Sequence, residues 1–397
     1  MKKNKICNVC KKKLKYFINI GDHPCADTFL KSKKKSLNLN KFPLIVGYCN
    51  CNHLSAVVKV SPHQRYKQYD YSYTSNNSPV SVSHFYNIAD KLVKKFKINK
   101  SNKVVEIGSN DGTFLKNIKK LSDANILGID PSDNMCKIAK KNGVKSLNIF
   151  FNHKNSRLIK KNYGEFDLLY GANVFNHIEN PYDFLKACKK IVKKSGIIVL
   201  EVPDLDSLFK SVGFDTIYHE HRQYFSINSI VKLFKIMDLN LIKIEKIDYM
   251  SGSLRLYAKN EKYKMKYILK NKISYKNFSV FKRRISLVKD KILDFVNQNI
   301  SKGNVIVGLG AATKGNTLLN FCKLDSSKVK CILEKSPYKI GKFMPGTGIK
   351  IVDEKKFKNY DAAIILPWNI SKHLHKKFLQ KSNISYTSIS KIVSKLK

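Results

Sequence analysis

The sequence predicts an α/β protein built on a doubly wound, Rossmann-like sheet, with a small cysteine-bearing unit before it and a smaller α/β unit after it. Short β-branched runs alternate with helical patterns across residues 84–203, and again from residue 304 onward. Five of the nine cysteines lie before residue 75, in a stretch that lacks long helical periodicity. A repeated succession of strand, crossover helix and strand is the pattern of a doubly wound parallel sheet.

In the central stretch, hydrophobic spacing and β-branched runs define each element in turn. Ile88, Leu92 and Phe96 recur every four residues, which predicts a helix over residues 84–96. Strands are expected at residues 103–107, 125–129, 166–171 and 196–202, and helices at residues 113–121, 133–142 and 181–194.

The C-terminal stretch opens with a charged helical pattern over residues 275–299. Strands are then expected at residues 304–308, 329–334 and 361–366, with a helix at residues 311–321. We therefore expect three domains, which span residues 1–75, 76–250 and 251–397. A chain of 397 residues is long enough for two or three hydrophobic cores.

No run of 18 or more apolar residues occurs in the chain, so no membrane span is expected. The N-terminal Met-Lys-Lys-Asn-Lys-Ile-Cys has basic residues but no apolar stretch behind them, which disfavours a signal peptide. We therefore expect a cytoplasmic protein. In that compartment cysteines serve as thiols or metal ligands more often than as disulfides.

The formal net charge of +46 raises the question of a nucleic-acid partner. Lysines are spread along the whole chain, however, whereas arginine, which suits bidentate phosphate and base contacts, is scarce. This distribution disfavours a dedicated nucleic-acid function. It is compatible with attraction of a small anionic substrate, and we expect a monomer or weak dimer.

The N-terminal cysteines include two close pairs, Cys7-x-x-Cys10 and Cys49-x-Cys51. Two pairs of thiolates supply the tetrahedral sulfur ligands that zinc prefers. The second pair is spaced more tightly than is usual, and His53 is an alternative ligand. No ligand position is left open, so the zinc expected here is structural. The competing interpretation is a set of free cysteines.

Glu106-Ile-Gly108-Ser-Asn110-Asp111-Gly112 follows a predicted strand and opens a predicted helix. Gly108 and Gly112 allow a sharp turn and a close approach to a ligand. Carboxylate and amide side chains in such a turn suit a cationic, hydroxyl-bearing ligand, and S-adenosylmethionine (SAM) fits because its sulfonium is positive. Residues that end neighbouring strands complete the expected cofactor site, namely Asp130, where a carboxylate can accept ribose hydroxyls, and Asn173.

The segment Asp215-Thr-Ile-Tyr218-His-Glu220-His221 concentrates titratable side chains. Such a density fits poorly in a core and suits a substrate whose proton must be removed. His221 is the predicted base, because the pKa of histidine lies near working pH. Glu220 or Asp215 is expected to hold its ring, and Tyr218 to donate to the substrate oxygen. His177 fits a lid or a surface histidine equally well.

Two further turns carry weaker signals. The first resembles a phosphate-binding turn at a helix N-terminus and has the sequence Gly308-Leu-Gly310-Ala-Ala-Thr-Lys314-Gly315-Asn316. Ser251-Gly-Ser253 with Arg255 fits either an anion site or a turn that enters a strand.

Taken together, these motifs resemble the three-domain SAM-dependent C-methyltransferases of deoxysugar biosynthesis, which methylate a carbon beside a ketone on a nucleotide-linked sugar. The matching motifs beyond those quoted above are Phe42-Pro-Leu44, Tyr71-Ser-Tyr73-Thr-Ser75, Asn173-Val-x-x-His177, Glu201-Val-Pro203, Pro345-Gly-Thr347 and Pro367-Trp368-Asn369. The chain departs from the family at Met250-Ser251-Gly252, where a paired glycine is usual.

The resemblance implies an N-terminal zinc domain, a central methyltransferase sheet and a C-terminal Rossmann-like domain. It implies that Tyr218, Glu220 and His221 are catalytic and that Tyr71 and Tyr73 face the sugar. By the same motifs we predict that the substrate-binding residues also include His177, Lys314 and Asn316.

The expected reaction removes a proton beside the ketone, stabilises the enolate, and lets the carbon attack the methyl group of SAM. Two alternatives remain. The C-terminal glycine turn favours an NAD-dependent sugar-nucleotide oxidoreductase or epimerase, with Glu334 as the acidic partner. The basic, cysteine-bearing chain also fits a nucleic-acid methyltransferase.

Overall fold

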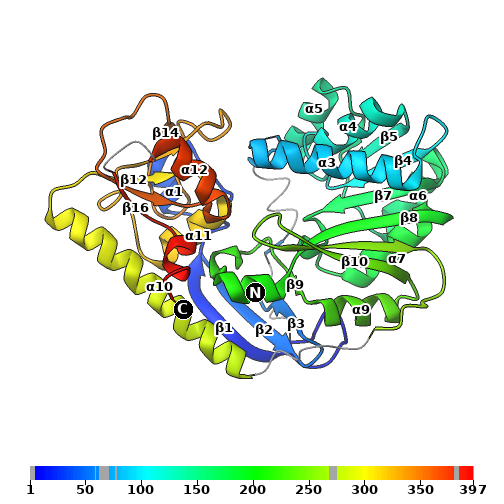
Figure 1. Cartoon of the computed structure of the whole chain (residues 1–397), viewed down its shortest axis with the longest axis horizontal. Coiled ribbons are helices and arrows are strands. Elements are labelled where there is room, and N and C mark those ends of the chain that lie inside the picture. Colours follow the sequence, from blue (N-terminus) through cyan, green and yellow to red (C-terminus); the bar gives the residue numbers. More distant parts are fainter. Residues whose placement is uncertain are drawn as a thin grey trace.

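The computed structural model describes residues 5–58, 60–61, 71–76, 78–267, 275–379 and 384–396, without the side chains of residues 275 and 276. Within these ranges the strands form three sheets. The central sheet and its helices lie on the right of Figure 1 and the C-terminal sheet on the left, with the N-terminal strands below and between them.

The central sheet has seven strands in the order β10-β11-β8-β7-β4-β5-β6. Five of them run parallel, and β11 and β10 are added antiparallel at one edge. The strand bounds are β4 Lys103–Ile107, β5 Asn125–Ile129, β6 Ser146–Leu147, β7 Phe166–Ala172, β8 Val192–Pro203, β10 Asn240–Ile247 and β11 Ser253–Lys259. The expected doubly wound α/β class is confirmed.

Both faces of this sheet are covered because consecutive strand residues point to opposite sides. Val104 and Leu168 pack with α3, α4 and α5. Val105 and Leu169 pack with α6, α7 and α9. The helix bounds are α3 Pro79–Phe96, α4 Thr113–Ser122, α5 Asp133–Lys141, α6 His153–Tyr163, α7 Pro181–Ile191 and α9 Ile227–Ile236.

One boundary differs from the sequence prediction. The helix expected over residues 181–194 ends at Ile191, and the chain continues without a break as β8. Val192 is already extended (φ −97°, ψ 133°) and pairs with Phe166. Strand pairing therefore overrides the helical preference of the lysines that follow. Strand β11 lies beyond the boundary expected at residue 250 and still belongs to the central sheet.

The N-terminal sheet has the order β1-β2-β3-β9. Its strands are β1 Lys15–His23, β2 Phe42–Cys49, β3 His53–Ala56 and β9 Gln223–Phe225, with α1 Lys33–Leu37 beside them. Strand β9 follows closely after Asp215–His221, the histidine-rich segment, and it pairs antiparallel with β3. The N-terminal sheet thus holds the end of a segment that is more than 150 residues away in the sequence.

The C-terminal sheet is parallel, in the order β14-β13-β12-β15-β16. Its elements are α10 Tyr275–Ser301, β12 Ile306–Leu309, α11 Thr313–Phe321, β13 Cys331–Glu334, β14 Ile351–Asp353, β15 Ala362–Ile365, α12 Ser371–Phe378, β16 Ser385–Thr387 and α13 Ile389–Val393. The long helix α10 runs along the outside of the N-terminal strands (Figure 1).

A single hydrophobic core joins the N-terminal and C-terminal sheets. Phe17 of β1, Phe281 of α10 and Ile306 of β12 belong to it, and so does Phe214. This last residue opens a short 3₁₀ turn, Phe214–Thr216, which follows helix α8 Leu205–Ser211. The core therefore fixes the start of the histidine-rich segment against the C-terminal unit.

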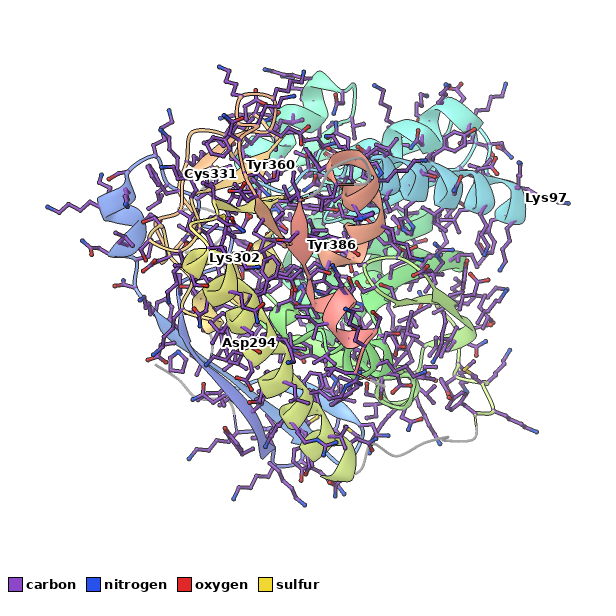
Figure 2. The ribbon with its side chains drawn as sticks, turned by 60° about the vertical axis from the view of Figure 1, so that its left-hand side comes forward. Lys97, Asp294, Lys302, Cys331, Tyr360 and Tyr386 are labelled. Atoms are coloured by element: carbon purple, nitrogen blue, oxygen red, sulfur yellow. The ribbon has the colours of Figure 1, made fainter. Side chains whose placement is uncertain are left out.

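Nitrogen-tipped side chains project from all visible edges of the molecule (Figure 2). The positive charge is thus spread over the surface and does not gather in one stripe on the face shown. No helix in the described part of the chain is long and apolar enough to cross a membrane.

Candidate functional site

The glycine turn after β4 lies at the carboxyl edge of the central sheet. Its backbone adopts left-handed conformations at Gly108 (φ +70°), Asn110 (φ +52°) and Gly112 (φ +79°). A side chain at Gly112 would place its Cβ 2.9 Å from Val144. The turn therefore needs glycine for conformation and for space, and it brings backbone close to where a ligand binds in such sheets.

Three carboxylates surround this turn. Asp130 accepts hydrogen bonds from the Asn110 and Ser132 amides at 2.9 and 2.8 Å. Burial, followed by the charges of Asp111 and Asp130, raises the pKa of Glu106 well above its ordinary range. One Glu106 oxygen, Oε2, is buried without a hydrogen-bond partner. The negative charges of Asp111 and Asp130 beside this turn suit a positively charged ligand.

The tyrosine segment, residues 71–76, folds over the same turn. Asn110 Oδ1 accepts from the Ser75 amide at 2.9 Å, and Asn110 Nδ2 donates to the Tyr73 carbonyl at 3.0 Å. The Tyr71 amide donates to Oδ1 of Asn134 on α5, and Nδ2 of Asn134 donates to the Tyr71 carbonyl. The predicted sugar-facing tyrosines and the predicted cofactor turn are thus physically joined.

Asn173 follows the end of β7 in a left-handed conformation (φ +53°), and its amide donates to the Glu201 carbonyl at 2.9 Å. Four residues later, the His177 ring lies 5.0 Å from the His221 ring, centroid to centroid. His177 is therefore half-buried beside His221, and its assignment as a substrate-binding residue stays a prediction.

His221 is held by a backbone carbonyl. Its Nδ1 lies 2.7 Å from the Thr216 oxygen, which can only accept, so Nδ1 carries the proton. Nε2 is then the unprotonated nitrogen of the neutral ring. Burial, with a contribution from Lys314, lowers the pKa of His221 to about 4. The expectation that Glu220 or Asp215 holds this ring is wrong at Nδ1, where Thr216 takes that place.

Tyr218 packs against His221 with ring centroids 4.0 Å apart. The neighbouring Glu220 carboxyl is buried. His219 points elsewhere, with Nε2 3.1 Å from the Phe42 carbonyl. The three residues predicted to be catalytic therefore include two, Tyr218 and His221, in direct ring contact.

The C-terminal unit contributes to this cluster. Trp368 of the 3₁₀ turn Trp368–Ile370 donates its indole N–H to Asp215 at 2.8 Å. The Lys314 ammonium lies 4.3 Å from the centre of the Trp368 ring. Burial raises the pKa of Asp215 to about 6, and burial lowers the pKa of Lys314 to about 8. The charge of each group partly offsets the effect of burial on the pKa of the other.

Several buried polar atoms near His221 have no hydrogen-bond partner among the described residues. They are Asp215 Oδ1, the Tyr224 hydroxyl and both amide heteroatoms of Asn176. Buried polar groups are nearly always paired, so such a group of atoms marks a place where a ligand or ordered water binds. Asn176, next to His177, was not singled out from the sequence; only its burial reveals it.

The C-terminal glycine turn is filled by the protein itself. Glu334 Oε2 accepts from the Ala311 amide at 2.8 Å. A Cβ at Gly310 would lie 2.8 Å from Pro367, and one at Gly315 would lie 2.5 Å from Leu366. These glycines allow close packing of α11 on the sheet. The phosphate-binding interpretation of this turn is not supported, because a carboxylate occupies the position of the anion.

Two other predicted substrate residues lie on this helix. Lys314 lies 4.3 Å from the centre of the Trp368 ring and interacts with Asp215, whereas Asn316 is buried and its amide oxygen accepts from Asn320 on the same helix at 3.3 Å. Thr313 donates to Asp27 at 3.1 Å, and Asp27 also binds Ser72 at 2.6 Å. The start of α11 is thereby tied to the tyrosine segment.

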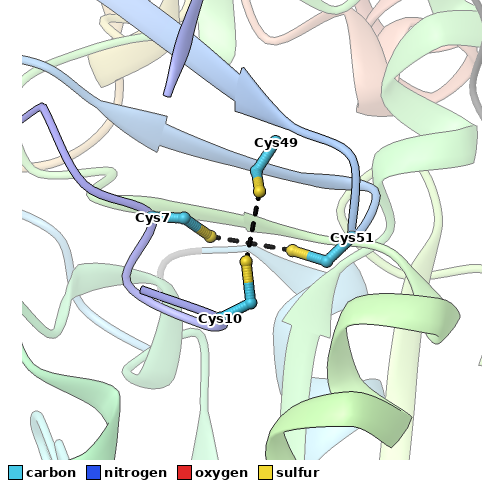
Figure 3. Close-up of side chains that lie close together, drawn as sticks. All are labelled: Cys7, Cys10, Cys49 and Cys51. Atoms are coloured by element: carbon cyan, nitrogen blue, oxygen red, sulfur yellow. Dashed lines mark hydrogen bonds between the residues drawn. The ribbon is translucent and has the colours of Figure 1, made fainter. Parts of the chain in front are cut away.

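The four predicted zinc ligands converge (Figure 3). The sulfurs of Cys7, Cys10, Cys49 and Cys51 all lie within 4.8 Å of one another, with closest pairs at 3.2 and 3.6 Å. Four sulfurs at about 2.3 Å from a zinc ion would be about 3.8 Å apart. The tight Cys49-x-Cys51 spacing is therefore compatible with tetrahedral geometry, because β2 ends in a turn that aims both thiols inward.

His53 is not a fifth member of this group. Its Nε2 lies 2.8 Å from Gln223 Oε1, so the alternative in which His53 replaces a cysteine is not supported. The same hydrogen bond links strand β3, which begins two residues after Cys51, to strand β9, which begins two residues after His221. The cysteine cluster and the segment Asp215–His221 are thus neighbours through one strand pair.

A buried ion network lies at the end of β8. Glu201 accepts from His84 and from Arg255, both at 2.7 Å. Residues 251–253 form the turn that enters β11, so Arg255 pairs with Glu201 and does not hold an external anion. The His84 ring lies flat on Tyr249, with centroids 3.6 Å apart and planes 4° apart.

A pocket of about 440 Å³ lies at the opposite, amino end of the C-terminal strands. Lys302 and Tyr360, labelled in Figure 2, are among its lining residues. None of the residues predicted to bind cofactor or substrate lines it.

Two family models match most of the chain. Residues 83–244 match a methyltransferase domain, and residues 250–386 match a C-methyltransferase C-terminal domain. The C-methyltransferase NovU of Streptomyces niveus is 26% identical over 383 residues, which cover 91% of this chain and 90% of NovU. The ubiquinone biosynthesis O-methyltransferase of Pelagibacter ubique is 23% identical over 193 residues, which cover 44% of this chain and 78% of that enzyme.

Among solved structures, the plantazolicin methyltransferase BpumL in complex with SAH has a TM-score of 0.36 and 15% identity, and the match covers 45% of this chain and 82% of BpumL. Both domain matches and the relative aligned along nearly the whole chain agree with the cofactor turn described above. They identify this chain as a SAM-dependent C-methyltransferase.

Proposed function

We propose that this C-methyltransferase acts on the carbon beside the ketone of a nucleotide-linked 4-keto deoxysugar, with His221 as the base. The observation that carries the proposal is the 2.7 Å hydrogen bond between His221 Nδ1 and the Thr216 carbonyl, which places the proton on Nδ1. Burial lowers the pKa of the ring, so the ring is neutral at neutral pH and Nε2 can accept a proton. A neutral imidazole with one unprotonated nitrogen can act as the acceptor when a proton beside a carbonyl is removed.

The oxygen of the resulting enolate needs a donor or a positive charge. Tyr218 lies against the base, and Lys314 is a buried ammonium close enough to affect the pKa of His221. In a site of low dielectric such groups stabilise developing negative charge strongly. We assign the enolate oxygen to this side of His221, toward Tyr218 and Lys314.

In the balanced step, the bond between the carbon and its proton breaks and Nε2 of His221 accepts the proton. The electron pair becomes the enolate and then forms the new carbon–carbon bond to the methyl group. SAM would supply that methyl group from its positively charged sulfonium, where the carbon–sulfur bond would break and its electron pair would remain on sulfur as the neutral thioether. The roles of the chain are to orient the two reactants and to hold the proton.

We assign the cofactor to the turn after β4. The residues that would hold it are Glu106, Gly108, Asn110, Asp111, Asp130 and Asn173. The orphaned Oε2 of Glu106 and the three carboxylates around the turn fit a cationic ligand. On the substrate side we assign Tyr71, Tyr73 and His177, because the first two are joined to the cofactor turn and the third touches His221.

We further propose that Cys7, Cys10, Cys49 and Cys51 hold a structural zinc ion. Four sulfurs converge with no other described ligand among them, and a site saturated by four thiolates leaves no position for substrate. The oxidoreductase alternative is disfavoured, because Glu334 binds the backbone of the glycine turn at which the pyrophosphate of NAD would lie.

The proposal is tested with labelled SAM and a panel of nucleotide-linked 4-keto deoxysugars that carry deuterium beside the ketone. We expect methyl transfer to carbon, loss of deuterium from that position, and loss of both on substitution of His221. NAD-dependent reduction of the ketone is the comparison reaction. Transfer to oxygen, or transfer with deuterium retained at both carbons flanking the ketone, would overturn the proposal.

A further inference from the structure

We propose that His84 is a positioning residue for the tyrosine pair at the sugar side of the site. It fixes Tyr249, and through Tyr249 it fixes the hydroxyl of Tyr73. The inference rests on the proposed function, because it gives Tyr73 a substrate to contact. It assigns a role to an ion network that the methyl-transfer mechanism does not use.

The network is anchored at the end of β8. The Glu201 side chain is completely buried and carries two partners, His84 and Arg255, at 2.7 Å each. Burial alone would raise the pKa of Glu201, but the hydrogen bonds and charges of those partners outweigh it and hold the pKa below its ordinary value. The carboxylate therefore remains charged and fixes the direction of the His84 ring.

The His84 ring in turn fixes Tyr249. The two rings are 3.6 Å apart and nearly parallel, and Tyr249 is itself buried. The ring of Tyr249 therefore cannot rotate or shift without movement of His84, which Glu201 holds. Close stacking of this kind transmits position because buried side chains have little free volume.

Tyr249 is also presented by a strained turn. Met250 (φ +51°) and Ser251 (φ +74°) both adopt the left-handed conformation that favours glycine. The Gly252 amide donates to the Tyr249 carbonyl at 3.1 Å to close the turn. Non-glycine residues keep such a conformation only where their surroundings determine it, and the stack on His84 is one of these surroundings.

Tyr73 completes the chain of contacts. Its phenol lies close enough to the side chains of Tyr249 and Ser81 for both to affect its pKa, and the Tyr249 hydroxyl lies 3.4 Å from Ser81 Oγ. Burial raises the pKa of both phenols, so both remain protonated donors. The carbonyl of Tyr73 is held by Asn110 of the cofactor turn. His84 therefore sets where the Tyr73 hydroxyl lies relative to a backbone that is already fixed at the methyl donor.

The test compares His84→Asn, which removes the stacked ring but retains a donor for Glu201, with wild type and with Tyr73→Phe. The matched control is His375→Phe, since His375 also packs on a tyrosine, Tyr386, with ring centroids 4.8 Å apart and in the C-terminal unit. We expect His84→Asn to lower kcat/KM for the keto sugar roughly 10- to 100-fold, because small misplacement of a binding group costs this much. The dissociation constant of SAM should change less than about twofold, and His375→Phe should match wild type in both.

A double-mutant cycle separates positioning from general damage. In the Tyr73→Phe background, His84→Asn should lower kcat/KM little further, because the hydroxyl that His84 positions is already absent. An equal loss in both backgrounds would overturn the inference. A crystal structure of His84→Asn in which the Tyr73 hydroxyl keeps its wild-type position beside Tyr249 and Ser81 would also overturn the inference. That structural result is independent of turnover, whereas failure of wild type with every keto sugar would count against the proposed substrate alone.

Discussion

Trp368 donates its indole N–H to Asp215 at 2.8 Å, across the junction between the C-terminal unit and the catalytic segment. It is the only tryptophan of the chain. Asp215 is completely buried, and its second oxygen has no partner. The indole therefore provides the only side-chain hydrogen bond that Asp215 makes within the described residues, and it fixes the start of the segment that ends at His221.

Replacement of Trp368 by Phe should destabilise the protein and lower its activity together. Removal of the donor leaves a buried carboxyl without a hydrogen bond, which costs about 1–3 kcal/mol. The measurement is urea denaturation of Trp368→Phe in the wild-type and Asp215→Asn backgrounds. We expect a smaller loss in the second background, and equal losses would contradict a role for this hydrogen bond.

Replacement of His221 by Ala should abolish turnover and leave SAM binding intact. A positioned general base contributes roughly 10²- to 10⁴-fold, so kcat should fall by that factor. The hydrogen bond and ring contacts of His221 within the described residues are to Thr216, His177, Tyr218 and Tyr224 and not to the turn after β4, so calorimetric titration with SAM should give a dissociation constant within about twofold of wild type. His373→Ala, at an exposed position on α12, is the control. Near-normal turnover of His221→Ala would remove it as the base.

The pH profile should differ from that of an enzyme with an ordinary histidine base. The active form of His221 is neutral and is favoured as pH rises, so with a pKa of about 4 it is already formed at pH 6. The Lys314 ammonium is lost as pH rises through about 8, so kcat/KM should fall there. Lys314→Arg keeps its charge and should lose this alkaline limb. Persistence of the limb near pH 8 in that variant would assign it to another group.

Much of this arrangement could be predicted from the sequence. The strand at residues 103–107 matches β4 in full, because a β-branched run beside a glycine turn is a strong local signal. The convergence of the four cysteines and the sharp glycine turn after β4 were also predictable, since residue type and spacing indicate both. Local pattern alone was sufficient in these places.

The tertiary partners could not be predicted. No spacing indicates that the Thr216 carbonyl holds His221, or that Glu334 fills the C-terminal glycine turn. The first contact depends on how the segment between Thr216 and His221 folds back on itself. The second depends on how β13 packs beside the glycine turn. The pairing of β9 with β3 is a further example, because its register is set by the core and not by the three residues of the strand.

The C-terminal glycine turn should respond to mutation as a packing feature. Gly315→Ala places a methyl group 2.5 Å from Leu366 without any change of backbone conformation, and such overpacking costs about 1–3 kcal/mol. Gly303→Ala is the control, because it tests backbone strain without overpacking. Gly303 has φ +71°, and an added methyl group there would have nothing within 4 Å. Thermal denaturation should rank Gly315→Ala below wild type, with no NAD binding in any variant. NAD binding that Gly315→Ala abolishes would restore the oxidoreductase interpretation.

Removal of the cysteine cluster should affect the catalytic segment as well as the N-terminal strands. Cys49 ends β2, and its neighbour β3 pairs with β9, whose Gln223 holds His53 at 2.8 Å. Structural zinc contributes on the order of 10 kcal/mol to the folding of small zinc domains, so its loss should release this strand pair.

Cys49→Ser is therefore expected to lose its zinc, to melt at a lower temperature and to lose turnover, while it still binds SAM at the distant turn after β4. Metal analysis should give one zinc per wild-type chain and none in the variant. Cys331→Ser, a buried cysteine in the C-terminal sheet, is the matched control and should keep both metal and turnover. If Cys49→Ser retains stoichiometric zinc, the four-thiolate site is wrong. If it loses zinc and turns over normally, the β3–β9 pair does not position His221.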